Sequence, residues 1–250
     1  MHTRSKPISV GNPDAPRRVL IIHGYTGSPD EFQELAAVLA ERLDAYVEVP
    51  LLPGHGTTEE DLVTYSLDDF LNVVETHVQK VAQAGKPFAL VGHSLGAHFA
   101  LCAAAKYPPQ AAVATVMPYS LRPPFSIPGM DLYARTKQFW DKPLSPQELG
   151  ERKNHFYYKR MPGIALGFLK EANQRLKKIA FQLKFPILTI NNSEDPVSYR
   201  ESGENFLQDS GKNPHNRHII LDKKEHGLFY GPSRDKVITL IAEFLEKQML

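Results

Sequence analysis

The sequence is poor in cysteine and carries almost no net charge, and both absences narrow what the protein can be. Its 250 residues contain a single cysteine, Cys102, so no disulfide can form within the chain. Disulfides are rare in reducing compartments, and this composition favours a cytoplasmic location. Twenty-nine Lys and Arg residues against 28 Asp and Glu residues leave a formal net charge of +1. Such a balanced surface argues against nucleic acid as a partner.

Long apolar runs are missing as well. No apolar run is long enough to span a bilayer, and residues 1–16 lack the apolar segment of a secretion signal, so we expect no stable membrane insertion. No His, Cys and Asp spacing resembles a metal site, and no G-x-G-x-x-G follows a strand. We therefore predict no metal and no other cofactor. The length allows one large domain or two small ones, as a monomer or a homodimer.

What the chain does have is a regular alternation of short apolar runs and longer segments of helical period. Ser28 and Pro29 are expected to be the N-cap and the first residue of the first helix. Alternation of this kind predicts an α/β fold, with a mostly parallel sheet covered by helices on both faces. Strands are expected at 17–24, from 45 into the turn at 53–56, and at 87–92, 111–117, 185–192 and 216–221. Further helices are expected at 67–81, 94–107, 163–183 and 233–248.

The middle of the chain breaks this alternation. Residues 119–161 are rich in proline and aromatic residues and contain no clear strand. We interpret 119–176 as a small cap inserted after the fourth recognisable strand, over one end of the sheet. Residues 1–118 and 177–250 then form the core.

The segment "GHSLG" places one hydroxyl between two glycines, where a predicted strand passes into a predicted helix. Such a turn forces its central residue, Ser94, into strained φ/ψ, and bulkier residues at Gly92 and Gly96 would collide there. The turn exposes the serine Oγ at the carboxyl end of the sheet, which is typical of a nucleophile. A purely structural turn with an incidental serine is the alternative.

A serine nucleophile needs a base, which in this arrangement follows it along the chain. His226 lies in the loop between the last strand and the final helix, at the same sheet edge as Ser94, and is our choice. Three of the other histidines that follow Ser94 are weighed as the base. His155 lies in the cap, His215 lies before the last strand, and His218 lies inside that strand.

An acid is needed to orient the base. Asp195 is our choice, because it follows a predicted strand and Pro196 restricts the chain directly beyond its carboxylate. Glu194 and Asp222 stay open as alternatives. In the expected mechanism Ser94 attacks an acyl carbonyl, the histidine moves the proton, and the acid holds the imidazole tautomer.

The developing oxyanion needs hydrogen-bond donors. We expect the backbone N–H of Leu95, at the start of a helix, and that of Tyr25, in the loop after the first predicted strand. The Tyr25 side chain would then be free to line the acyl pocket. His23, His55 and His93 are interpreted as residues that shape the surrounding loops.

Five ordered motifs carry a resemblance: "LIIHGYTGSPDEF", "LPGHG", "LVGHSLG", "SEDPVS" and "EHG". Together they resemble the α/β-hydrolase superfamily, and most of all its small bacterial carboxylesterases and monoacylglycerol lipases. The resemblance implies the α/β-hydrolase fold, a small cap, ester hydrolysis and no cofactor. Tyr25 stands where the family usually has phenylalanine, Leu95 where it has methionine or glutamine, and Ala97 where it often has glycine. The resemblance therefore does not extend to the pocket lining.

The sequence thus predicts a serine esterase for short- to medium-chain acyl esters, with monoacylglycerols among the candidates. Cinnamoyl or feruloyl esters, and C–C bond hydrolysis on the same triad, are alternatives; a non-catalytic binding protein of this fold is a third. Apolar cap residues could form a tunnel for an acyl chain, or could simply pack the cap on the core. Those proposed for the tunnel are Phe125, Ile127, Met130, Phe139, Trp140, Phe156 and Tyr157.

Overall fold

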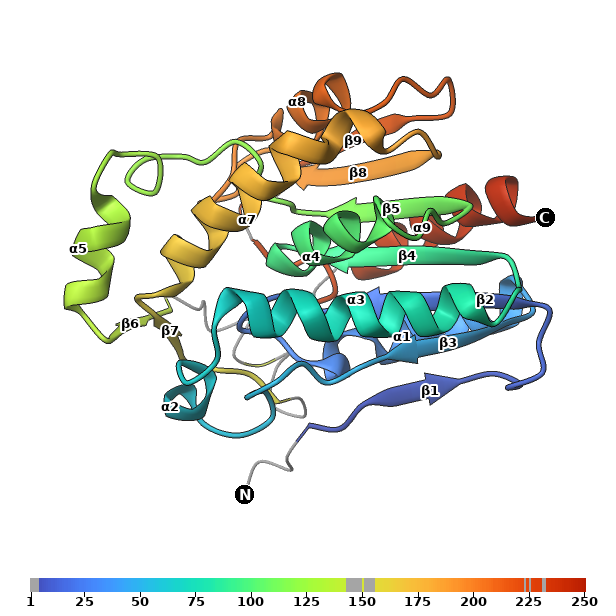
Figure 1. Ribbon diagram of the computed structural model, residues 1–250, viewed down its shortest axis with the longest axis horizontal. Coiled ribbons are helices and arrows are strands. Elements are labelled where there is room, and N and C mark those ends of the chain that lie inside the picture. Colours follow the sequence, from blue (N-terminus) through green and yellow to red (C-terminus); the bar gives the residue numbers. More distant parts are fainter. Residues whose placement is uncertain (1–4, 143–149, 151–155, 223, 225, 231–232) are drawn as a thin grey trace.

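The computed structural model describes residues 5–142, 150, 156–222, 224, 226–230 and 233–250. Its centre is a seven-stranded sheet of order β1-β3-β2-β4-β5-β8-β9 (Figure 1). Neighbouring strands pair in parallel except for β1, which runs antiparallel to β3 at one edge. The predicted α/β class with a mostly parallel sheet is confirmed. The strands are β1 Ile8–Val10, β2 Arg17–Ile22, β3 Ala45–Val49, β4 Phe88–His93, β5 Ala111–Thr115, β8 Ile187–Asn192 and β9 Arg217–Leu221.

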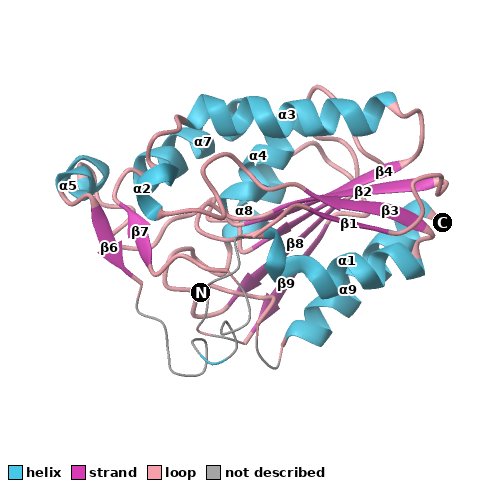
Figure 2. Ribbon diagram, turned by 90° about the horizontal axis from the view of Figure 1, so that it is seen from below, coloured by secondary structure: helices cyan, strands magenta, loops and turns pink. Residues whose placement is uncertain are grey.

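Helices cover both faces of this sheet, which explains why its central strands are continuously apolar. Every residue of β4 and β5 is buried. Figure 2 shows α3 (Leu67–Gln83), α4 (Leu95–Ala104) and α7 (Ala165–Ile179) on one side, and α1 (Gln33–Arg42) and α9 (Arg234–Met249) on the other. Each layer has its own hydrophobic core against the sheet.

The starts of the helices show where local sequence rules hold. Helix α3 opens with a capping box between Ser66 and Asp69, and the Thr58 side chain caps the short helix α2 (Glu59–Leu62). Ser28 and Pro29 are the N-cap and first residue of a short 3-10 helix, Pro29–Phe32, rather than of α1, which starts at Gln33. The Ser28 side chain makes no capping hydrogen bond. Its buried hydroxyl instead donates to the Phe156 carbonyl, 3.0 Å away. A tertiary contact outcompetes the local cap.

The insertion after β5 stands off one end of the sheet, at the left of Figure 1. It contains α5 (Met130–Thr136) and an antiparallel ribbon of β6 (Phe139–Asp141) and β7 (Arg160–Pro162). The expectation that residues 119–161 hold no clear strand is therefore wrong. Each strand is only three residues long and finds its partner about twenty residues away, so neither leaves a periodic pattern.

The expected far boundary of the cap falls inside a helix. Helix α7 continues to Ile179, past the expected boundary at 176, and packs along α4. A 3-10 turn, Ala180–Gln182, then leads back to the sheet at β8, and α8 (Ser202–Asp209) connects β8 with β9.

Because these strands are parallel, the loops that follow them lie at the same end of the sheet, at the carboxyl ends of the strands. The loops after β2, β4, β8 and β9 lie there, and they carry Tyr25, Ser94, Asp195 and His226. Within the described residues, no helix is both long and apolar enough to cross a membrane.

Candidate active site

Ser94 lies on a strained turn between β4 and α4. Its φ of 52° and ψ of −124° are rarely adopted by residues with a side chain. A Cβ on Gly92 would lie 2.4 Å from the Ala97 Cα, and one on Gly96 would lie 2.3 Å from the His23 carbonyl oxygen. Only glycine fits at either position. The Ser94 N–H donates to the Thr115 carbonyl at 2.8 Å, which ties the turn to β5.

The structure brings Ser94, His226 and Asp195 together in one hydrogen-bonded chain. The Ser94 Oγ lies 2.8 Å from His226 Nε2, and His226 Nδ1 lies 2.7 Å from an Asp195 carboxylate oxygen. A carboxylate can only accept, so Nδ1 carries the ring proton and Nε2 is left to accept from the serine hydroxyl. This is the tautomer that a general base for serine requires.

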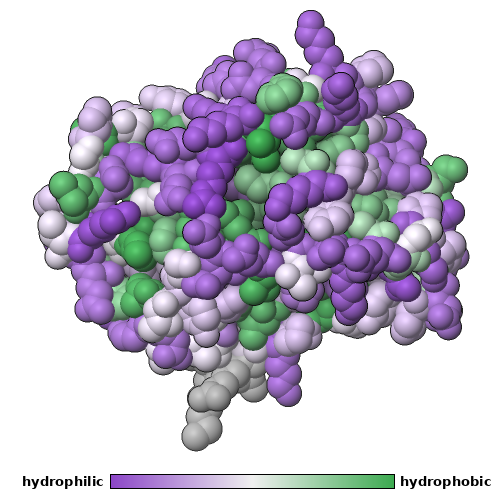
Figure 3. All heavy atoms as spheres, in the orientation of Figure 1, coloured by the Kyte–Doolittle hydropathy of each residue, from purple (hydrophilic) through white to green (hydrophobic). Residues whose placement is uncertain are grey.

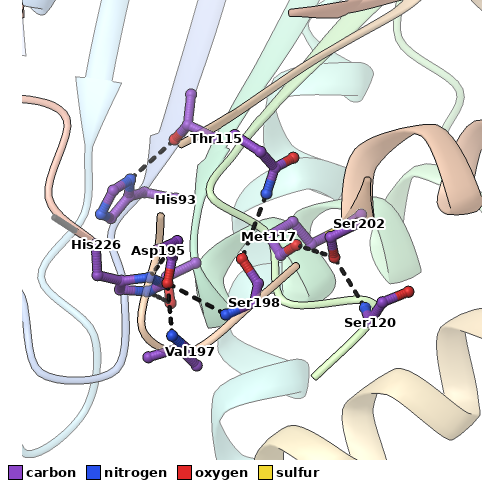
Figure 4. Close-up of polar contacts among 11 residues, drawn as sticks. His93, Thr115, Met117, Ser120, Asp195, Val197, Ser198, Ser202 and His226 are labelled. Atoms are coloured by element: carbon purple, nitrogen blue, oxygen red, sulfur yellow. Dashed lines mark hydrogen bonds and ion pairs between the residues drawn. The ribbon is translucent and has the colours of Figure 1, made fainter. Parts of the chain in front are cut away.

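The Asp195 carboxylate is fully buried and satisfied on its far side. Its second oxygen accepts from the N–H groups of Val197 at 2.7 Å and Ser198 at 3.2 Å (Figure 4). Burial is the largest influence and raises the pKa of this carboxyl, but the His226 imidazole and the two N–H donors outweigh it, so the net pKa lies below the usual value. The group is therefore ionised at neutral pH.

The two alternative acids point elsewhere. Glu194 is exposed and lies 3.3 Å from the Lys224 ammonium, while Asp222 accepts from the Ser193 hydroxyl at 3.0 Å. Neither carboxylate has a contact with His226 among the described residues. The geometry favours Asp195.

The remaining histidines considered as bases have other surroundings. His215 is exposed before β9, and His218 inside β9 bonds the Thr189 hydroxyl and the Arg200 carbonyl. His155 lies outside the described residues. His93, beneath the turn, contacts the Thr115 hydroxyl at 2.9 Å (Figure 4) and packs edge-on against Phe229.

Both predicted oxyanion donors belong to backbone segments that adjoin Ser94. Leu95 is the first residue of α4, where backbone N–H groups have no helical acceptor. The loop after β2 passes close to the turn, because a Cβ on Gly24 would be 3.3 Å from the Ser94 Cβ. Tyr25 is the next residue of that loop.

Comparison with known proteins decides the family. The model of a family described as "Alpha/beta hydrolase family" matches residues 19–200, well over half of the chain. The chain belongs to the α/β-hydrolase family. The matched residues include the strained turn at Ser94 and the loop that carries Asp195. The match confirms the fold and the family that the five motifs predicted.

Esterases and lipases are among the relatives of this hydrolase. It is 25% identical over 235 residues to a carboxylesterase of Bacillus subtilis. The aligned region covers 92% of this chain and 93% of that carboxylesterase. A thermostable monoacylglycerol lipase of Bacillus sp. strain H-257 is 32% identical over 95 residues, 38% of either chain. The fold of a monoacylglycerol lipase from Paleococcus ferrophilus superimposes with a TM-score of 0.78 at 17% identity, over 97% of this chain and 98% of that chain.

The aromatic surroundings of the hydrolase's Tyr25 come from two helices, one before the proposed cap and one that begins within it. Its ring is buried and meets Phe70 of α3 at 5.5 Å and Phe168 of α7 at 5.6 Å, both edge to face. Phe70 and Phe168 carry no recognisable motif in the sequence, because the helical period to which each belongs indicates core packing and nothing more.

Three of the cap residues expected in the pocket contact other side chains of the cap. The Arg160 guanidinium stacks on the Phe139 ring at 4.4 Å, and Tyr133 packs edge-on against Trp140 at 6.0 Å. Phe125 and Met130 are half-buried, and Ile127 is 46% exposed. Phe156 is buried against Tyr158, while Tyr157 is half-buried. The ring contacts of Phe139 and Trp140 thus lie within the cap, while Phe156 belongs to the buried cluster that contains Tyr25. Among the described residues, no group of His, Cys, Asp and Glu has the geometry to hold a metal ion.

Proposed function

We propose that this protein is a serine hydrolase that cleaves carboxylic esters through an acyl-enzyme. The observation that carries the proposal is the unbroken chain of short contacts, 2.7 Å and 2.8 Å, from the buried Asp195 carboxylate through His226 to Ser94. An incidental surface serine would need neither a strained backbone nor a correctly tautomerised imidazole.

The arrangement suits a two-step acyl transfer. His226 Nε2 takes the hydroxyl proton as Ser94 Oγ bonds to the ester carbonyl carbon, and the backbone N–H groups of Tyr25 and Leu95 stabilise the oxyanion. When the tetrahedral intermediate collapses, the imidazolium returns the proton to the departing alcohol. A water molecule, activated by the same histidine, then hydrolyses the acyl-enzyme and restores the serine.

The proposed substrates are short- to medium-chain acyl esters, including monoacylglycerols. The carboxylesterase of Bacillus subtilis supports this, since it is similar over nearly the whole length of both chains. The aromatic contacts around Tyr25 support an apolar acyl site next to the proposed oxyanion hole.

An activity-based probe tests the nucleophile directly. A fluorophosphonate should label the native protein at Ser94 alone, as mapped by peptide mass spectrometry, and should abolish ester hydrolysis in step with labelling. Heat-denatured protein serves as the control, because labelling there would be chemical rather than catalytic. Labelling at another serine, or none in an active preparation, would refute the proposal.

A substrate panel tests the chemical class. Rates are measured on p-nitrophenyl esters of increasing chain length, monoacylglycerols, methyl ferulate and a vinylogous diketone that reports C–C cleavage. We expect kcat/KM to be highest among the acyl esters. A preference for methyl ferulate or the diketone would move the assignment to a feruloyl esterase or a C–C hydrolase, and inactivity on all of them would indicate a binding protein.

A further inference from the structure

The carboxyl ends of the parallel strands, where Ser94, Asp195 and His226 lie, are called the active edge below. Two loops at this active edge are joined by buried imidazoles. One follows β2 and contains His23, Gly24 and Tyr25; the other is the "LPGHG" turn after β3, with Leu52 and His55. The rings of the two histidines meet edge to face, 4.7 Å apart, and both are almost completely buried. Neither histidine touches Ser94 in the contacts of the described residues, so the proposed reaction does not use them directly.

His23 holds the peptide that would supply the oxyanion donor. The Leu52 N–H donates to its Nε2 at 3.2 Å, so its proton must be on Nδ1, which then donates to the Gly24 carbonyl at 2.9 Å. The Gly24 carbonyl and the Tyr25 N–H belong to the same planar trans peptide and point in opposite directions. A hydrogen bond that holds the carbonyl therefore also aims the N–H.

His55 holds the next peptide. Its Nε2 lies 2.6 Å from the Tyr25 carbonyl oxygen, and its Nδ1 lies 2.9 Å from that of Pro53. Burial lowers the pKa of His55 to about 4, so at neutral pH the ring is uncharged and has one N–H to donate. We place that proton on Nε2, which makes the shorter of the two contacts. With the peptides on both sides of Tyr25 held, its φ and ψ have little freedom.

We propose that His55 is a positioning residue for the oxyanion hole, donating from Nε2 to the Tyr25 carbonyl and so fixing the direction of the Tyr25 N–H. This inference rests on the proposed function. The packing supports a fixed ring orientation, because His55 meets the rings of Tyr25, Phe70 and Tyr158 edge to face at 5.9 to 6.2 Å. The "LPGHG" turn thereby becomes part of the catalytic framework without touching substrate.

The test compares His55→Leu, which removes the donor, with His55→Gln, whose amide nitrogen can reach the position of Nε2. We expect His55→Leu to lower kcat about 10- to 100-fold, less than outright loss of an oxyanion donor, with KM changed by less than about 3-fold. Affinity for an alkyl trifluoromethyl ketone, which forms a tetrahedral adduct, should fall in parallel with kcat/KM. His55→Gln should recover most of both losses.

Tyr158→Phe is the matched control. Its hydroxyl donates to the Gly54 carbonyl at 3.0 Å, so the substitution removes the same kind of bond from the same turn but leaves the Tyr25 peptide alone. It should lower the Tm while kcat stays within about 2-fold of the wild type. An equal loss of kcat in Tyr158→Phe would show that the turn acts only through general stability and would overturn the proposal.

Every variant is titrated with the fluorophosphonate, so that kcat refers to reactive sites. Wild type that fails to react at Ser94 would refute the proposed function itself. Wild type that reacts and turns over, with His55→Leu turning over equally per site, would refute only the role of His55. If His55→Leu does not fold, His55→Asn against His55→Gln decides, because the shorter amide cannot reach the Tyr25 carbonyl and should show the lower kcat.

Discussion

Different interactions stabilise the active edge of the sheet and the cap. At the edge, the side chains of Ser94, His226 and Asp195 are fixed by short hydrogen bonds, and Asp195 has no exposed surface. In the cap, aromatic and cationic side chains stack on one another, and Leu132 and Tyr133 of α5 are 70% and 53% exposed. Figure 3 shows hydrophobic residues reaching the surface among hydrophilic ones at that end of the molecule.

From this contrast we propose different tasks for the two regions. Proton transfer requires donors and acceptors at fixed distances, which the rigid carboxyl ends of parallel strands supply. Selection of an acyl chain requires apolar surface, which tolerates looser packing and sequence change. We therefore expect substitutions at the edge to change the chemical step and substitutions in the cap to change the substrate preference.

The largest effect should come from removing the nucleophile. We expect Ser94→Ala to lower the rate of ester hydrolysis by about 10⁵- to 10⁶-fold, as loss of a triad nucleophile does. Steady-state assays with p-nitrophenyl esters measure it, and Ser210→Ala, a buried serine bonded to the Leu207 carbonyl, is the control. Near-normal activity of Ser94→Ala would mean that the chemistry lies elsewhere.

Loss of the acid should cost less than loss of the nucleophile. Asp195→Asn should lower kcat by about 10⁴-fold, because the amide favours the wrong imidazole tautomer. Glu194→Gln changes the neighbouring carboxylate, which is exposed and paired with Lys224, and should leave kcat within about 2-fold. Equal losses in the two variants would contradict the assignment of Asp195.

The buried histidines of the edge and the core should make the fold sensitive to acid. Burial lowers the pKa of His55 and of His98 to about 4, from 6.5. Below pH 6.5 the unfolded chain binds protons that the folded chain does not, so the free energy of unfolding should fall between pH 6.5 and 4. Each group contributes about 3 kcal/mol over that range.

Urea unfolding at a series of pH values measures this dependence. Substituting His98 with Gln removes one titrating group and should flatten the dependence over the same interval. A free energy of unfolding that stays constant from pH 6.5 to 4 would show that these rings are not held neutral by the fold.

The smallest effect should come from the cap. Trp140→Ala should leave kcat/KM on p-nitrophenyl acetate within about 2-fold but lower it by about 10-fold on the longest ester accepted, if the cap contributes apolar contact to the acyl chain. Leu132→Ala, on the exposed face of α5, is the matched control. A uniform fall across all chain lengths would instead tie Trp140 to the chemistry and weaken the contrast between the regions.

Much of the site could be predicted from the sequence because its determinants are local. The glycines at 92 and 96 are required by the close approach of Ala97 and of the His23 carbonyl to the turn, and such a requirement leaves a readable motif. The order of Ser94, Asp195 and His226 along the chain places all three after strands of one parallel sheet.

Other features depend on partners far away in the chain, and only the tertiary structure decided them. The Ser28 hydroxyl donates to the Phe156 carbonyl, 128 positions away, instead of capping a helix. Strands β6 and β7 pair with each other across a long separation in the chain. The choice of Asp195 over Glu194 rests on which carboxylate is buried against His226, and the contact between His55 and the Tyr25 carbonyl joins two loops. Sequence patterns record conformational preferences of neighbouring residues, whereas these choices are set by burial and by hydrogen bonds that form only once distant segments have packed together.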